Sequence, residues 1–271
     1  MKKRLDIIVF EKGFTNSREK ARSLIMQGDV YINNQKCDKP GMIYDEDCIV
    51  DVRSNKQKYV SRGGFKLEKA INSFSINLKD KICMDVGAST GGFTDCMLQN
   101  GCKKVYAVDV GYGQFDWNLR NDKRVVVLER TNARYIDESI INDKVDFFSV
   151  DVSFISLGLI LPAIKKVSSN SSCGVCLIKP QFEAGRGKVG KNGVVRDKSV
   201  HIEVINKVLK YSLKNNFYVM GLDYSPIKGP KGNIEYLLHL ENGEDEGADK
   251  SNFIDIEKVV ENSHLELSGG D

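Results

Sequence analysis

A glycine-rich turn joins an apolar strand to the start of a helix in residues 82–94, which read ICMDVGASTGGFT. Glycine suits a place where a bound molecule approaches the backbone, because a side chain would obstruct it. The spacing is G-x-x-x-G-G and not the G-x-G-x-x-G of dinucleotide sites. The carboxylate of Asp85 would repel a pyrophosphate but suits a cofactor with an ammonium group, such as S-adenosylmethionine. The residues expected to contact this cofactor are Asp85, Gly87, Ala88, Ser89, Thr90, Gly91, Gly92 and Phe93.

Apolar segments of strand length alternate with helical segments through most of the chain that follows residue 80. Helices are expected at 94–99 and 200–213. This alternation predicts an α/β fold with helices on both faces of a mainly parallel, Rossmann-like sheet. Only a loop rich in glycine and proline separates the last two strands, so they should pair antiparallel at one end of the sheet. The expected strands are 82–86, 105–110, 125–128, 145–150, 175–178, 218–224 and 236–240.

Two residues that follow later strands extend the predicted cofactor pocket. Asp109 ends the second strand, where an acid can hydrogen-bond both ribose hydroxyls of an adenosine. Asn132 follows the third strand and is expected to contact the adenine edge. The turn and Asp109 together indicate a cofactor site more specifically than either feature alone. Some other α/β enzyme with a glycine turn stays an alternative.

Four charged residues stand where catalytic chemistry is expected. Asp151 and Lys179 end the fourth and fifth strands, and the carboxyl ends of parallel strands line the ligand crevice of such a sheet. Lys66 opens a helix that precedes the first strand, and Glu235 opens the last strand. We therefore expect Asp151 and Lys179 to meet beside the cofactor. Each of these residues in isolation would more often be a surface salt-bridge partner.

The front of the chain is basic and forms a separate unit. Residues 1–66 carry fourteen Lys or Arg and nine Asp or Glu; the net charge of +3 for the whole chain therefore leaves −2 for the rest. A basic front end of this kind favours binding to phosphate groups. The alternative is a basic surface that contacts only solvent. One helix should end at Gly13, and a second should follow Ser17, a good N-cap, and end at Gly28. Strands are predicted at 30–32 and 48–52.

This front unit resembles an S4 domain, a small RNA-binding module. The resemblance covers residues 4–52 and lies in Arg4-Leu5-Asp6, Gly13, Ser17-Arg18, Ala21-Arg22, Leu24-Ile25, Gly28-Asp29-Val30 and Ile32-Asn33. In such domains the second helix presents basic residues to structured RNA, by phosphate contact rather than by base reading. The resemblance implies RNA contacts for Arg4, Arg18, Lys20 and Arg22.

The whole chain is similar to the TlyA family of ribosomal RNA 2′-O-methyltransferases, whose catalytic domain is of the FtsJ type. The similar segments are SRGGFKL at 61–67, the turn at 85–94, DVGYGQ at 109–114, DVSFIS at 151–156, KPQFE at 179–183 and GPKGNIE at 229–235. The resemblance implies S-adenosylmethionine as cofactor and methylation of a cytidine ribose in large-subunit RNA. Longer members also modify a small-subunit cytidine. The fuller N-terminal helix of this chain is that of the longer type, so both targets are expected.

Related enzymes carry a Lys-Asp-Lys-Glu tetrad, which falls here on Lys66, Asp151, Lys179 and Glu235. A ribose 2′-hydroxyl is a poor nucleophile until its proton is removed, and the resemblance implies that Lys179 is the base that removes it. Lysine accepts a proton only when it is neutral. Burial and the ammonium of Lys66 favour that form, whereas Asp151 favours the charged form. Asp151 should also orient Lys179 and contact the cofactor, and Glu235 should orient Lys66 or the ribose.

Four regions are expected along the chain. They are an S4-like domain over 1–56, a linker over 57–60, an FtsJ-like methyltransferase domain over 61–242 and an acidic tail over 243–271. The tail is expected to be partly disordered or to form one short helix. Residues 183–196 are rich in glycine and predict a mobile loop that clamps RNA phosphates, with a plain flexible loop as the alternative. The RNA-binding candidates in this domain are Arg62, Arg186 and Lys188.

Composition narrows the class of protein further. The longest apolar stretches are far shorter than the roughly 20 residues of a membrane span, and the N-terminus lacks the apolar core of a signal peptide. We therefore expect a cytoplasmic protein that works on ribosomal RNA or ribosomal subunits, without a membrane or an obligate protein partner. Of the seven cysteines only Cys173 and Cys176 have C-x-x-C spacing, and no second pair completes a zinc site, so no metal is expected.

Three rival functions stay open at the level of the sequence. S4 domains also precede pseudouridine synthases, and Arg4-Leu5-Asp6 resembles a fragment of such an active site, although it lies here inside the S4 domain. The glycine-rich turn and the residues at strand ends favour methyl transfer. A second rival is a non-catalytic ribosome assembly factor. A third is a haemolysin-like membrane-active protein, against which the lack of a membrane-length segment weighs.

Overall fold

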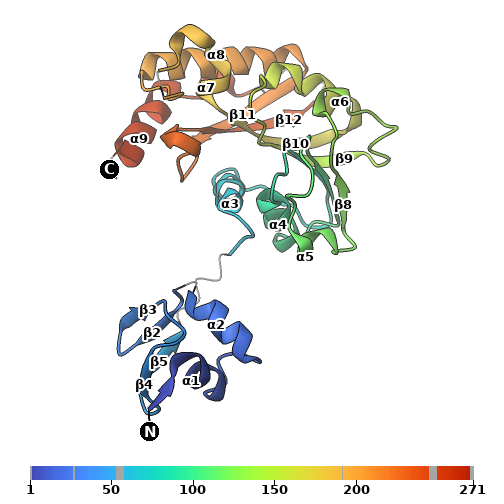
Figure 1. Cartoon of the computed structure of the whole chain (residues 1–271). Helices are drawn as coiled ribbons and strands as arrows, with labels where there is room; N and C mark the ends of the chain where they lie inside the picture. Colours follow the sequence, from blue (N-terminus) through green and yellow to red (C-terminus); the bar gives the residue numbers. More distant parts are fainter. Residues whose placement is uncertain (1, 27, 53–57, 191, 244–248, 269–271) are drawn as a thin grey trace. The chain divides into compact units, whose positions relative to one another are not determined.

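The computed structural model describes residues 2–26, 28–52, 58–190, 192–243 and 249–268. The chain divides into two compact units, Met1–Gln57 and Lys58–Asp271 (Figure 1). Each unit buries its own set of apolar side chains. The two units are therefore described one at a time.

Two helices and two small sheets make up the described part of the first unit. Helix α1 (Leu5–Glu11) packs on α2 (Arg18–Met26) through buried apolar residues of both helices. Strand β2 (Val30–Ile32) lies between β3 (Gln35–Cys37) and β5 (Val50–Val52). A second pair is formed by β1 (Lys2–Arg4) and β4 (Ile43–Asp45).

The predicted local signals of this unit are present. The hydroxyl of Ser17 accepts a hydrogen bond from the backbone N–H of Lys20 at 3.2 Å, as an N-cap does. Asn33 and Asn34 have φ angles of 50° and 67° and turn the chain from β2 into β3. Strands β1, β3 and β4 were not predicted, because they are short and, unlike β2, contain mostly polar residues.

A seven-stranded sheet forms the centre of the second unit in the part of the chain that the structure describes. The strands lie in the order β11-β12-β10-β9-β6-β7-β8, and β12 alone among them runs antiparallel to its neighbours. Their bounds are β6 (Ile82–Val86), β7 (Lys104–Val108), β8 (Val125–Leu128), β9 (Val145–Val150), β10 (Ser168–Ile178), β11 (Phe217–Tyr224) and β12 (Tyr236–Asn242).

Helices cover both faces of this sheet (Figure 1). The core on one face includes residues of α3 (Gly63–Ser73), α4 (Gly92–Gln99) and α5 (Trp117–Arg120). The core on the other face includes residues of α6 (Leu161–Val167), α8 (Lys198–Lys214) and α9 (Ile256–Ser268). The shorter helical turns are α7 (Pro180–Glu183), η1 (Ala133–Tyr135), η2 (Leu157–Leu159), η3 (Arg186–Lys188), η4 (Pro230–Gly232) and η6 (Ser251–Phe253).

The predicted α/β class, the mainly parallel sheet and the antiparallel last strand are confirmed. Strand β10 begins at Ser168, seven residues before the expected start, because its first half is polar and carries no apolar signal. Of the two forms expected for the tail, the described residues take the helical one, α9, whose Val260 packs in the core. Cys173 and Cys176 belong to the cores of opposite sheet faces, which separates the two thiols of the C-x-x-C spacing.

The reversed strand β12 decides what meets at the carboxyl edge of the sheet. Its first residue, Tyr236, pairs with Ile178, the last residue of β10. Strand β12 starts at the edge where β10 and β11 end. Glu235 and Lys179 are therefore brought to the same edge although 56 positions separate them in the sequence. No helix in the described ranges is long and apolar enough to cross a membrane.

Candidate active site

The glycine-rich turn lies where β6 passes into α4, as predicted. Gly87 has a φ of 86°, and a Cβ there would collide with the carbonyl oxygen of Asp151. Gly92 opens α4, and a Cβ there would collide with the hydroxyl of Ser61 and approach the backbone N of Gly64 to 3.0 Å. The first glycine therefore allows two strand ends to approach each other, and the last one allows α3 to approach α4.

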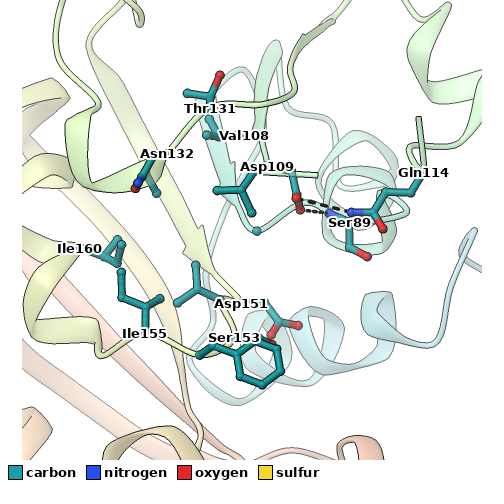
Figure 2. A pocket seen from close by; sticks show the side chains of 15 residues that line it. Ser89, Val108, Asp109, Gln114, Thr131, Asn132, Asp151, Ser153, Ile155 and Ile160 are labelled. Atoms are coloured by element: carbon teal, nitrogen blue, oxygen red, sulfur yellow. Dashed lines mark hydrogen bonds between the residues drawn. The ribbon is translucent and has the colours of Figure 1, made fainter. Parts of the chain in front are cut away.

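A hollow of about 430 Å³ opens at the carboxyl ends of β6, β7 and β9 (Figure 2). This volume lies in the range of small-molecule sites. The residues that line the hollow are Gly87, Ser89, Val108, Asp109, Val110, Gln114, Thr131, Asn132, Ala133, Asp151, Val152, Ser153, Phe154, Ile155 and Ile160. The predicted cofactor residues among them are Gly87, Ser89, Asp109, Asn132 and Asp151.

Asp109 holds the rim of the hollow together. One carboxylate oxygen accepts a hydrogen bond from the backbone N–H of Ser89 at 2.7 Å. The other accepts one from the N–H of Gly111 at 2.6 Å. It also accepts a longer one, 3.4 Å, from the side-chain amide of Gln114 (Figure 2). The acid at the end of β7 is thus oriented toward the turn that follows β6.

Asp85 does not line the hollow. Its side chain is fully buried and accepts hydrogen bonds from Thr94, through N–H at 2.9 Å and hydroxyl at 2.7 Å, and from the Ser149 hydroxyl at 2.9 Å. Burial raises the pKa of Asp85 to about 6, although these hydrogen bonds act to lower it. The carboxylate is therefore oriented toward the protein interior. The remaining predicted residues outside the lining are Ala88, Thr90, Gly91, Gly92 and Phe93.

Several residues of the lining were not among the predicted cofactor contacts. Phe154 has a φ of 64°, exposes 89% of its surface and packs its ring 4.8 Å from that of Phe182. The segment from Val152 to Ile155 directly follows Asp151. The rule that strand ends line the crevice would have found these residues if it had been extended beyond Asp151.

Glu183 supports this segment from below the surface. It is buried, and its carboxylate accepts hydrogen bonds from the backbone N–H of Leu157 at 2.7 Å and from the Ser156 hydroxyl at 2.8 Å. Burial raises the pKa of Glu183, against the effect of those bonds. The contact ties α7, which follows Lys179, to the chain that follows Asp151.

The four residues of the expected tetrad come together at the carboxyl edge. Lys66 Nζ lies 2.6 Å from Glu235 Oε2 and 3.6 Å from Asp151 Oδ2. Lys179 Nζ lies 2.5 Å from Asp151 Oδ1 and 3.2 Å from the hydroxyl of Ser153. Asp151 therefore bridges the two lysines, and it also lines the hollow.

The tetrad is shielded from solvent. Glu235 is fully buried, and 7% of each lysine is exposed. For Lys66, burial acts to lower the pKa, but the charges of Asp151 and Glu235 and the hydrogen bonds to them outweigh it and raise the pKa. Lys66 is therefore the ammonium that neutralises Glu235.

In the first unit, two of the RNA-binding candidates share one buried acid. The carboxylate of Asp6 is fully buried and accepts hydrogen bonds from Arg4 and from Arg18, at 3.1 and 3.2 Å for each guanidinium. These bonds lower the pKa of Asp6 although burial, the largest influence, acts to raise it. Lys20 and Arg22 are exposed on α2. Asp6 is thus a structural anchor for two arginines.

The candidates of the second unit are spread over its surface. Arg62 is exposed at the start of α3. Lys188 forms an ion pair with Glu203 of α8. The side chain of Arg186 lies outside the described part of the structure.

Comparison with known proteins agrees with both units. A model of FtsJ-like methyltransferases matches residues 59–242, and a model of the S4 domain matches residues 3–47. The chain is 42% identical to the 16S/23S rRNA (cytidine-2′-O)-methyltransferase TlyA of Mycobacterium tuberculosis, over 88% of this chain and 89% of that protein. It is 48% identical to Hemolysin A of Brachyspira hyodysenteriae, over 88% of this chain and 99% of that protein.

A solved structure extends the likeness to three dimensions. A proposed hemolysin of Streptococcus thermophilus is 45% identical, with a TM-score of 0.76 over 98% of this chain and 97% of that one. The match to this structure thus extends over both domains of the chain. The chain therefore belongs to the TlyA family and consists of an S4 domain followed by an FtsJ-like methyltransferase domain.

Proposed function

We propose that the protein transfers a methyl group from S-adenosylmethionine to the 2′-hydroxyl of a cytidine in ribosomal RNA. The observation that supports this most is the meeting of Lys66, Lys179 and Glu235 around Asp151, which lines the hollow. The relative from Mycobacterium tuberculosis is named for this reaction on 16S and 23S RNA, and we propose the large-subunit cytidine as target, with the small subunit as a second one.

The residues of the hollow fit an adenosine-containing cofactor. Asp109 offers carboxylate oxygens to a ribose at the end of β7, and Asn132 offers polar groups near the adenine. Apolar side chains of Val110, Ile155 and Ile160 provide surfaces for the base. When bound, the cofactor supplies an electrophilic methyl group on a positively charged sulfur.

We assign the role of general base to Lys179. Its ammonium has one carboxylate partner, Asp151, whereas Lys66 has two and a raised pKa that keeps it protonated. In its neutral form Lys179 accepts the proton of the ribose hydroxyl while the oxygen bonds to the methyl carbon and the carbon–sulfur bond breaks. Asp151 and Ser153 hold the amine in place, and alignment of the reacting atoms supplies much of the rate.

The first test is Lys179→Ala. We expect methyl transfer to a ribosomal RNA transcript to fall by roughly 10²- to 10⁴-fold, the usual contribution of a general base. Affinity for S-adenosylmethionine, measured by calorimetry, should stay within about threefold because Lys179 does not line the hollow. The matched control is Lys214→Ala, an exposed lysine at the end of α8, which should behave as wild type.

Residual turnover of Lys179→Ala within tenfold of wild type would remove Lys179 as the base. Mapping of ribose methylation in ribosomal RNA from cells with and without the protein tests the reaction as a whole. Identical maps, together with no binding of S-adenosylmethionine, would leave the non-catalytic assembly factor as the better function. We place the reaction in the cytoplasm, where ribosomal RNA and subunits are the proposed partners.

A further inference from the structure

A second hollow, of about 320 Å³, lies apart from the cofactor hollow and shares no lining residue with it. Its ionisable side chains are Arg196, Lys228, Lys231 and His264, and no acidic residue lines it among the described residues. We call this hollow the basic pocket. Nothing in the proposed methyl transfer uses it.

The cations of the basic pocket have no acidic partner within the described ranges. No carboxylate forms an ion pair there with Arg196, Lys228 or Lys231. The nearest acid along the chain, Asp197, instead caps α8 and accepts hydrogen bonds from the N–H and hydroxyl of Ser199, both at 2.8 Å. Three positive charges thus converge on a concave surface without neutralisation, which favours an anionic ligand.

Hydrogen bonds hold the two walls of the basic pocket together. Asn233 is 2% exposed; its amide donates to the carbonyl of Gly193 at 2.9 Å, and its side-chain oxygen accepts from the N–H of Val195 at 3.1 Å. The carbonyl of Val195 is in turn 3.0 Å from Nε2 of the buried His201. The pocket is therefore formed in advance of any ligand, which reduces the entropy lost on binding.

The loop between β11 and β12 connects the basic pocket to the tetrad. Ile234 lines the pocket and directly precedes Glu235, whose carboxylate packs against Gly229 at the start of this loop. A ligand in the pocket would therefore lie on the segment that positions Glu235 and, through it, Lys66.

We infer that the basic pocket binds a phosphate group, and that in the working enzyme this is a phosphodiester of the RNA substrate near the target nucleotide. The inference rests on the proposed function in so far as the substrate is RNA. A phosphodiester matches the pocket because its oxygens accept several charge-assisted hydrogen bonds from guanidinium and ammonium groups. The volume leaves room for part of the attached sugar.

The test measures RNA affinity against salt concentration for the full chain and for Lys228→Ala/Lys231→Ala, with a ribosomal RNA transcript as probe. A lost phosphate contact lowers the slope of log K against log salt by about 0.7 to 0.9, so the double variant, which removes a site for one phosphodiester, should lose about one unit. Its affinity for S-adenosylmethionine should be unchanged. The matched control is Lys210→Ala/Lys214→Ala, which removes two exposed lysines of α8 and should keep the wild-type slope.

Two further variants keep the test decisive. Lys228→Arg/Lys231→Arg retains the charge and should restore the slope. If the double alanine variant does not fold, Arg196→Gln applies the same test to an exposed side chain, with an expected loss of about one unit. An unchanged slope in the folded pocket variants overturns the inference, whether or not the enzyme methylates RNA.

Inorganic phosphate separates the two sources of the ligand. Competition of phosphate with RNA in wild type, weakened in Lys228→Ala/Lys231→Ala, supports a phosphodiester site. Phosphate binding that depends on these lysines while the RNA slope does not would mean a site for a small free phosphate, and would overturn the RNA assignment. A pocket-dependent slope in a protein that transfers no methyl group would refute the proposed reaction and leave this inference standing.

Discussion

At the scale of the residue, a carboxylate takes its role from what surrounds it. Asp85 and Asp151 are both acids near the ends of strands. Asp85 is fully buried and hydrogen-bonded to Thr94 and Ser149. Asp151 instead lines the hollow and bridges two lysines. The burial of Asp85 has a measurable consequence, because its pKa of about 6 lies above that of an unfolded chain.

Asp85→Asn should remove a pH dependence of folding. Between about pH 4 and 6 the folded wild type holds a proton that the unfolded chain has released, so its free energy of unfolding falls as pH rises, by roughly 2 to 3 kcal/mol in total. Asparagine keeps an acceptor for Thr94 and can donate to Ser149, and it does not titrate. Urea unfolding at pH 4.5 and 7 should show a fall in the wild type that exceeds the change in the variant by about this amount.

Asp80→Asn is the matched control, because Asp80 is exposed and its φ of 61° suits asparagine. The same Asp85→Asn protein also tests the expected contact with the cofactor's ammonium group. Because Asp85 does not line the hollow, we expect the affinity for S-adenosylmethionine to change by less than about threefold. A tenfold loss in calorimetry would mean that the carboxylate acts on the cofactor after all.

At the scale of the element, the contact between α3 and α4 positions Lys66 in the candidate active site. Lys66 lies on α3, and α3 approaches the start of α4 over Gly92. The hydroxyl of Ser61 and the backbone of Gly64 occupy the space that a Cβ of residue 92 would need. The position of Lys66 relative to the turn at Gly87 therefore depends on the absence of one side chain.

We expect Gly92→Ala to push α3 away from α4. Overpacking of this kind costs roughly 1 to 3 kcal/mol of unfolding free energy, and methyl transfer should fall more than S-adenosylmethionine affinity because Lys66 moves with α3. Urea unfolding and turnover measure the two effects. Gly187→Ala is the control, because among the described residues nothing beyond its chain neighbours lies within 4 Å of the added Cβ, and it should stay within about 0.5 kcal/mol. A Gly92→Ala protein as stable and active as this control would refute the close approach.

At the scale of the whole molecule, two units with separate cores divide the work. The first unit buries its own apolar cluster and holds Arg4 and Arg18 on Asp6, whereas the second contains the complete cofactor hollow and tetrad. We therefore expect each unit to perform its own binding reaction.

A chain shortened to residues 58–271 should keep the affinity for S-adenosylmethionine within about threefold. Its affinity for a ribosomal RNA transcript should fall by more than tenfold, since the phosphate contacts expected for the S4 domain are lost. Calorimetry and a salt series measure the two. Arg18→Gln/Arg22→Gln in the full chain is the companion variant, with a smaller loss of RNA affinity. Equal RNA affinity of the full and shortened chains would contradict the division of work.

Much of the fold follows from local pattern. The seven central strands could be predicted because buried strands are largely continuous apolar runs, and the turn at Gly87 because glycine there leaves room for a close approach to the backbone. The missing parts are short or polar: β1, β3 and β4 have three residues each, and the first half of β10 carries serines and an asparagine. Such segments are held by their neighbours rather than by their own periodicity.

The amino-acid order alone was enough to predict the α/β class and the two domains and, through the family resemblance, to propose the four tetrad residues, since strand ends and motifs are local features. Only the tertiary structure decided that β12 lies against β10 and so places Glu235 beside Lys66. It also decided that Asp85 is buried away from the hollow. The common pocket of Arg196, Lys228 and Lys231 was likewise visible only in the tertiary structure. The physical reason is that burial, ion pairing and the convergence of charges depend on contacts between distant segments, and periodicity along the chain does not record which segments meet.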